Sequence, residues 1–165
     1  AEVVKPSEPS EAAKAAAAEI QKQISAALGK ENDVKDAISI VATTEGVMIS
    51  VTDQLDFGMF EIGSALPRRD LVLAMEKIGK VLASRQGKIQ IRGHTDGRPF
   101  RSEAYDNWRL SSSRAQSTYY MLVRGGLDEK RVTEVAGLAD RALKVPDDPY
   151  AAANRRIEIL LDLPQ

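Results

Sequence analysis

The segment 89–116 gathers the side chains whose types and spacing could do chemistry. It contains the chain's only histidine, His94, which lies two residues before Asp96, together with four serines and several arginines that include Arg114. A histidine, a carboxylate and a hydroxyl are the parts of a nucleophilic triad, and carboxylates with an imidazole can hold a metal ion. A carboxylate beside a guanidinium can instead bind a charged ligand without changing it.

Catalysis has little support from the sequence. His94 and Asp96 lie at the end of a predicted strand, and no serine of the segment lies in a Gly-x-Ser-x-Gly turn. Because His94 is the only histidine, base and nucleophile would both depend on one strand terminus. We interpret His94 as a structural residue whose ring bonds a neighbouring loop, and we predict no catalytic residue.

A metal site has little more support. Zinc takes three or four ligands from cysteine, histidine or carboxylate, and this sequence has one histidine and no cysteine. Asp96 and Asp106 could bind a hard cation together with backbone oxygens, but no calcium-loop signature surrounds them. We therefore predict neither a metal site nor a cofactor.

A binding pocket fits the residue types best. Asp96 follows a predicted strand, and Arg114 lies seven residues after Asn107, on the second turn of the predicted helix. In a strand-loop-helix unit these two ends can meet at one cleft. The carboxylate would accept from an ammonium and the guanidinium would donate to a carboxylate, which suits the zwitterionic end of an amino acid. The alternative is an Asp96–Arg114 salt bridge that only ties the loop to the helix.

The totals limit the class of protein. The chain has 165 residues, 43% of them hydrophobic, which is enough for one domain with a core. With 23 basic and 24 acidic residues the net charge is -1, so we predict no nucleic-acid partner. No apolar run is long enough for a transmembrane helix, and the start lacks the features of a signal peptide. We expect a fragment or a mature form.

Hydrophobic periodicity divides the chain into a linker, 1–36, and a domain, 37–165. The linker contains an amphipathic helix at about 11–28, whose apolar stripe would rest on the domain or on a second copy. The domain is predicted to follow the order β-β-α-β-α-β-β and to form an α+β two-layer sandwich with a mixed sheet and helices on one face. Strands are predicted at 37–43, 47–52, 88–93, 132–137 and 155–162, with a turn at Glu45-Gly46 and helices that begin at Pro67 and at Asp106 or Asn107.

Three short motifs in this order resemble the OmpA-like peptidoglycan-binding domain. They are GHTD at 93–96, N-x-x-L-S-x-x-R-A at 107–115 and NRRIEI at 154–159. The resemblance covers roughly 45–163. Within that family the chain is most similar to the MotB group of flagellar stator subunits, through Met59-Phe60, 63–65, Pro99-Phe100 and Asn107-Trp108.

The resemblance implies that the domain binds the cell wall without catalysing a reaction on it. Asp96 would bind the ammonium, and Arg114 the carboxylate, of diaminopimelate in the peptidoglycan stem peptide. Asn107 and Leu110 would line the pocket, with Thr95 near the ligand. Strand alternation allows at most one arginine of the pair 155–156 to face this site. We interpret Trp108 as a packing residue under the long loop, with a sugar-stacking platform as the alternative.

The resemblance also implies a cellular location and an assembly. The chain would be the periplasmic domain of a protein that a segment outside this chain anchors in the inner membrane. It would form a homodimer, through the apolar stripe or an exposed strand edge, and work with stator A subunits. Alternatives are a wall anchor of an outer-membrane lipoprotein, porin or secretion system, and a peptidoglycan hydrolase with His94 as base. The loop 97–106 is longer than in simple outer-membrane relatives and could shield the pocket or bind a partner.

Overall fold

The computed structural model describes residues 8–29, 32–53, 58–99 and 106–163. The described elements confirm the predicted α+β order, and two short 3-10 turns, η1 (Glu129–Arg131) and η2 (Ala152–Asn154), occur as well. The helices and strands are α1 (Glu11–Leu28), α2 (Asn32–Ala37), β1 (Ile38–Ala42), β2 (Gly46–Thr52), α3 (Arg69–Ala83), β3 (Lys88–His94), α4 (Asn107–Arg124), β4 (Val132–Gly137) and β5 (Arg156–Asp162).

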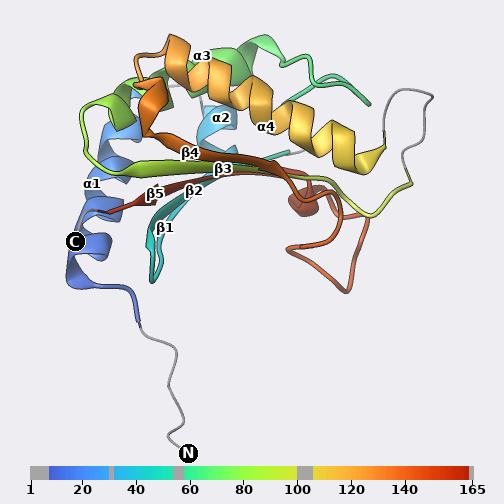
Figure 1. Ribbon diagram of the computed structural model, residues 1–165, viewed down its shortest axis with the longest axis horizontal. Helices are drawn as coiled ribbons and strands as arrows, with labels where there is room; N and C mark the ends of the chain where they lie inside the picture. The colour runs from blue at the N-terminus through green and yellow to red at the C-terminus, as the bar shows by residue number, and fades with distance from the viewer. Residues whose placement is uncertain (1–7, 30–31, 54–57, 100–105, 164–165) are drawn as a thin grey trace, which may run out of the picture.

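The five strands form one mixed sheet in the order β1-β2-β5-β3-β4. β3 and β4 are parallel, and α4 is the crossover between them, whereas β5 is antiparallel to both of its neighbours. α3 and α4 cover one face of the sheet, as Figure 1 shows. This arrangement confirms the predicted two-layer fold with helices on one face.

The core lies between the sheet and these helices. Ile49, Ile159 and Ile91 form one row across β2, β5 and β3, and all three side chains are fully buried. α3 contributes the predicted face Leu71, Met75, Ile78 and Leu82, which packs on this row and is also fully buried. The rigid central strands of the sheet therefore end in fixed positions, from which the loops of the site emerge.

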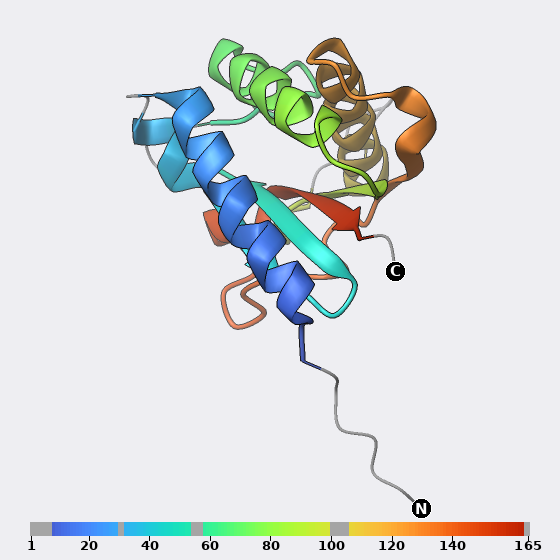
Figure 2. The same cartoon turned by 90° about the vertical axis from the view of Figure 1, so that its left-hand side faces the viewer.

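α1 packs along the same core. Ser10 caps its first turn by accepting a hydrogen bond from the Ala13 N–H, and its apolar stripe, which includes Ile20, Ile24 and Leu28, is buried against β1, β2 and α3. Figure 2 shows the helix lying along the β1–β2 hairpin. Because the stripe is already buried within the chain, it is not free to form the dimer contact that was one of the two predicted surfaces.

Three local predictions need correction. The two-residue hairpin turn is Thr44-Glu45, not Glu45-Gly46, since Thr43 and Gly46 already pair across it. Gly46 has a φ of 154°, and a Cβ there would lie 2.0 Å from the Leu161 carbonyl oxygen, so this glycine serves the close approach of β2 to β5. α3 begins at Arg69 because Pro67 pairs with Phe60 in an isolated β-bridge. The short helix α2 was not predicted.

The long connection from β4 to β5, residues 138–155, folds under the other face of the sheet, near the ends of the strands that lie opposite the C-terminus (Figure 1). Its residue Ala139 is buried, and the Ala139 carbonyl accepts a hydrogen bond from the Thr95 N–H directly after β3. Within the described parts of the chain, none of the helices has the length and apolarity needed to cross a membrane.

Candidate functional site

A cleft of about 680 Å³ opens where β2 and β3 end and where β5 and α4 begin. The segment 58–68, between β2 and α3, forms its remaining wall. All five predicted site residues line this cleft: Thr95, Asp96, Asn107, Leu110 and Arg114. The structure therefore brings together the side chains that the sequence motifs singled out.

α4 can reach the cleft because β3 has a glycine under the helix. A Cβ on Gly93 would lie 2.3 Å from the carbonyl oxygen of Ser111, so a larger residue would push α4 away from the sheet. Asp106 caps the helix by accepting from the Arg109 N–H at 2.8 Å. Asn107, Leu110 and Arg114 then follow at helical spacing, which places them on one face, toward the cleft.

Asp96 is buried and firmly held. Its Oδ1 accepts from the Arg98 N–H at 2.9 Å, and its Oδ2 accepts from Arg155 Nη1 at 2.6 Å. The exposed Arg98 side chain lies at the edge of ion-pair range, 3.9 Å from the same Oδ2. Each carboxylate oxygen keeps further lone-pair capacity, so Asp96 can accept from one more donor in the cleft.

Arg114 is buried without a carboxylate partner in the described part of the chain. Its Nε donates to the Ser64 carbonyl at 2.8 Å, its Nη2 reaches the Glu61 carbonyl at 3.5 Å, and its Cζ lies 5.0 Å from the centre of the Phe60 ring. Burial lowers the pKa of the guanidinium, while the nearby charges of Asp53 and Asp96 act in the opposite direction. An arginine stays charged in any case, so this buried cation still has donors available for an anion.

Arg155 joins two aspartates into one partly buried group that the sequence did not predict. Its Nε donates to Asp53 Oδ2 at 2.8 Å, while its Nη1 donates to Asp96. Asp53 is fixed in turn, because its Oδ1 accepts from the Met59 N–H at 2.8 Å. Burial alone would lower the pKa of Arg155, but the hydrogen bonds to Asp53 and Asp96 outweigh it and raise that pKa.

The strand pairing explains why Asp53 was missed. Thr52 pairs with Arg156 across β2 and β5, so the next residues outward, Asp53 and Arg155, lie opposite each other. The sequence contains Asp53 at the end of a predicted strand, but its role follows only once β2 is known to neighbour β5.

The alternation predicted for the arginine pair is confirmed. Arg155 lines the cleft, whereas Arg156 bonds Glu158 and the Ala142 carbonyl beneath the segment 138–155. His94 shares that second group, because its Nε2 lies 2.6 Å from Glu158 Oε1. The prediction that His94 is structural holds in this respect, but its ring bonds a neighbouring strand, β5, and not a loop.

Glu158 is therefore a strongly stabilised carboxylate. Burial alone would raise its pKa, but the hydrogen bond and charge of His94, followed by those of Arg156, outweigh it and lower the pKa to about 2. This group lies on the other side of the sheet from α4 and does not line the cleft.

The Asp96–Arg114 salt bridge that was an alternative is not what the structure contains. Asp96 pairs with Arg155, and Arg114 bonds backbone carbonyls instead. The two predicted ligand groups thus share one cleft while each is held by other residues. That arrangement is pre-organised for a ligand with one positive and one negative group.

The remaining predicted residues have mixed outcomes. Asn107 Nδ2 donates to the Arg98 carbonyl at 3.0 Å and so steadies the start of the loop. Ser111 lies outside the cleft and accepts from the Ala139 N–H, which ties α4 to the segment after β4. Trp108 is 46% exposed, with Arg141 over its ring, so its prediction as a packing residue was wrong. Most of the loop 97–106 lies outside the described residues; of the described part, Arg98 and Pro99 line the cleft.

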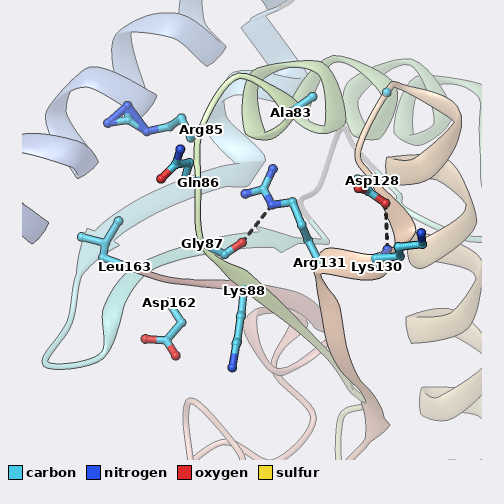
Figure 3. Close-up of a pocket in the computed structure, with 11 residues that line it drawn as sticks. Ala83, Arg85, Gln86, Gly87, Lys88, Asp128, Lys130, Arg131, Asp162 and Leu163 are labelled. Atoms are coloured by element: carbon cyan, nitrogen blue, oxygen red, sulfur yellow. Dashed lines mark hydrogen bonds between the residues drawn. The ribbon is translucent and has the colours of Figure 1, made fainter. Parts of the chain in front are cut away.

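A second, larger hollow of about 820 Å³ lies at the opposite end of the sheet (Figure 3). Its basic side chains do not converge: Arg85, Lys88 and Lys130 point in different directions in the close-up. Arg131, at its centre, donates to the Gly87 and Leu82 carbonyls at 2.9 and 2.7 Å, and so ties the loop before β4 to the end of α3. The contacts of Arg131 in this hollow therefore hold two segments of the fold together.

Neither hollow has the ligands of a metal centre. Across the described ranges, no three or more histidine, cysteine or acidic residues are grouped so as to hold a metal ion. The charged side chains that line the cleft are two acidic and four basic ones: Asp53, Asp96, Arg68, Arg98, Arg114 and Arg155. Such a site can bind and orient a charged ligand.

Comparison with known proteins identifies the family of the chain. The model of the OmpA family matches residues 59–156, which contain nearly the whole cleft. The chain is 34% identical over 126 residues to Motility protein B of Escherichia coli K12, covering 75% of this chain and 41% of that protein. It is 35% identical over 117 residues to the putative truncated flagellar export/assembly protein LafU of the same strain, covering 71% of this chain and 56% of that protein. The chain thus spans about half of these relatives or less.

Solved structures share the fold. A putative MotB-like protein from Desulfovibrio vulgaris superimposes with a TM-score of 0.71 at 20% identity, covering 92% of this chain and 97% of that one. The periplasmic domain of Helicobacter pylori MotB gives a TM-score of 0.65 at 21% identity, covering 78% of this chain and 83% of that one. A family match over more than half of the chain, with this fold and these motifs, leads to one conclusion. The chain belongs to the OmpA family, and it is related in sequence to Motility protein B.

Proposed function

We propose that this chain anchors a flagellar stator complex to the cell wall, so that ion-driven torque turns the rotor and not the stator. The observation that carries the proposal is the pairing of groups in the cleft. Arg114 is a buried cation with no carboxylate within ion-pair distance in the described residues, and it shares the cleft with the buried carboxylate of Asp96.

The ligand would be diaminopimelate in the stem peptide of peptidoglycan. Its free end carries an ammonium and a carboxylate on one carbon. The ammonium would donate to Asp96, and the carboxylate would accept from the Nη donors of Arg114 that the Ser64 and Glu61 carbonyls do not use. Leu110, which is almost fully buried, and Phe60 would contact the aliphatic part of the side chain.

The two protein groups are poised for binding and not for reaction. Asp96 and Arg114 are both fixed by hydrogen bonds before the ligand arrives, so little side-chain entropy is lost on binding. If either side chain were removed, the ligand group that it contacts would remain in the cleft without its charged partner. We expect loss of either counterpart to cost roughly 2–5 kcal/mol of binding free energy.

The stator setting rests on the relatives. Motility protein B and LafU match this chain over part of their length, so the remaining part of such a protein would supply the inner-membrane segment and the contact with stator A subunits. The chain would then lie in the periplasm and act as one member of a homodimer. An exposed strand edge is the other predicted dimer surface, and β1 and β4 are the two edge strands of the described sheet.

A wall anchor of another machine is the second candidate. The cell wall anchor of the type VI secretion system of Pseudomonas aeruginosa superimposes with a TM-score of 0.65 at 24% identity, covering 87% of this chain. That likeness concerns the fold alone, and the flagellar relatives are closer in sequence, so we favour the stator.

The proposal is tested by co-sedimentation with purified diaminopimelate-type peptidoglycan. The parent should sediment with the wall, and Asp96→Asn and Arg114→Ala should not. Arg124→Ala is the matched control, because Arg124 is an exposed arginine at the far end of the same helix. Normal sedimentation of both folded cleft variants would remove diaminopimelate recognition from this cleft.

A further inference from the structure

The charges of the cleft exceed what a single amino-acid end needs. Four arginines and two aspartates line it in the described residues, which leaves a surplus of two positive charges. Arg155 already lies between both aspartates, at 2.8 and 2.6 Å. A ligand end with one ammonium and one carboxylate is neutral and would leave the surplus as it is. The cleft therefore favours a ligand with additional acidic groups.

Once Arg155 is paired with the two aspartates, Arg68 remains available to bind an acidic group of the ligand. It lies directly before α3, and no carboxylate of the described chain comes within ion-pair distance of its guanidinium. Arg98 differs, because it approaches Asp96 at 3.9 Å and lies over the Tyr150 ring at 5.6 Å. Besides Arg114, which the proposed function assigns to the diaminopimelate carboxylate, Arg68 is thus the cleft arginine without a charged partner in the described chain.

The backbone holds Arg68 in place. Its N–H donates to the Met59 carbonyl at 2.9 Å, and its Nε lies 3.4 Å from the Phe60 carbonyl oxygen. A Cβ on Gly58 would lie 3.1 Å from the same Nε, so the side chain crosses the chain where a glycine leaves room for it. The Nε contact turns one edge of the guanidinium toward the protein and leaves the outer Nη atoms for a ligand.

Arg68 also lies beside the primary carboxylate site. Arg114 lies over the ring of Phe60, while Arg68 contacts the backbone carbonyl of that same residue. Two guanidinium groups that flank one phenylalanine can bind two carboxylates of one extended ligand, since each offers a planar set of donors.

We propose that Arg68 binds a second carboxylate of the stem peptide, beyond the diaminopimelate end. This inference rests on the proposed function of the cleft and specifies what its ligand must carry. Two carboxylates of the stem could supply this group: the α-carboxylate of the isoglutamate that precedes diaminopimelate, or the carboxylate at the peptide's C-terminus. Both make the stem peptide more acidic than its diaminopimelate end, as the surplus charge of the cleft requires. Amidation of the recognised carboxylate would weaken binding to the wall.

The test is calorimetric titration with synthetic diaminopimelate stem tetrapeptides in three forms: the free acid, the isoglutamine amide and the C-terminal amide. Arg68→Gln is compared with the parent and with Arg69→Gln. Arg69 is the next residue in the chain, is also exposed and does not line the cleft, so the control removes the same charge at nearly the same place.

Arg68→Gln should weaken binding of the free acid roughly 10-fold, the value of one hydrogen-bonded charge. The loss should disappear with the one amide that neutralises the recognised carboxylate, and that amide identifies the source. An equal affinity of Arg68→Gln and Arg69→Gln for all three peptides would overturn the subsite, while loss of binding in Arg114→Ala keeps the proposed function. If the parent binds none of the peptides, both proposals fail.

Discussion

Among the residues of the cleft, Arg155 is the one whose substitution should lower the stability of the fold most. We predict that Arg155→Met lowers the free energy of unfolding by about 2–4 kcal/mol. Removing one partner of a buried ion pair costs about 3–5 kcal/mol, because the other charge stays buried and unpaired. Here the side chains of Arg155, Asp53 and Asp96 keep 28%, 20% and 9% of their exposure, so water screens part of the effect. The melting temperature should fall by roughly 4–16 °C.

A double-mutant cycle measures this directly by urea unfolding at neutral pH. Arg155→Met, Asp53→Asn and the double variant are compared with the parent, and a coupling free energy of at least about 1 kcal/mol is expected. Arg92→Met is the control, since Arg92 pairs with Glu134 on the open face at 3.6 Å, with both side chains at least a third exposed, and should cost under about 1 kcal/mol. Additive effects in the cycle, or equal costs for Arg155→Met and Arg92→Met, would refute the role of Arg155 as a bridge.

Three further predictions concern the scaffold. The pKa of Glu158 is lowered from 4.5 to about 2, so its ionised form stabilises the fold above pH 4.5, and this stabilisation is lost as the pH falls toward 2. The difference in unfolding free energy between the parent and Glu158→Gln, measured by urea unfolding, should therefore shrink by about 3 kcal/mol over that pH range. Gly79→Ala should destabilise by about 2 kcal/mol or more in thermal unfolding, because its Cβ would lie 2.3 Å from the Leu122 carbonyl oxygen. Ile20→Ala should cost about 2–5 kcal/mol in urea unfolding if α1 belongs to the core, and under about 1 kcal/mol if the helix is only a tether.

Most helices and strands could be predicted from the sequence because their hydrophobic residues recur with a clear helical or strand period. Leu71, Met75, Ile78 and Leu82 recur at helical spacing, while Ile89 and Ile91 alternate with polar residues, and the structure has a helix and a strand there. α2 was missed because six residues are too few to establish a period. The start of α3 was placed too early because the partner of Pro67, Phe60, is not visible from local sequence.

The site was predictable only where its residues are close in sequence or part of a motif. Asp96 and Arg114 follow one strand-loop-helix unit, so their convergence could be expected from local geometry. Arg155 and Asp53 are 102 residues apart and meet only through the pairing of β2 with β5. The contact of Trp108 with Arg141 likewise depends on the long segment before β5, which brings Arg141 over the ring. Long-range pairing, and not residue chemistry, was the missing information.

The position of Ser10 has a mechanical consequence. Ser10 and Ala13 lie beside the hairpin residues Thr44 to Gly46, at the end of β2 opposite the cleft. In the proposed anchor, a pull between the preceding segment and the bound wall would therefore run along α1 and the strands. Hydrogen bonds between strands lie across that direction, so they would be loaded in parallel and would have to break together. α1 would have to slide over the sheet instead of peeling from it one turn at a time. The geometry is that of a tether loaded in shear, in which many weak contacts share one force.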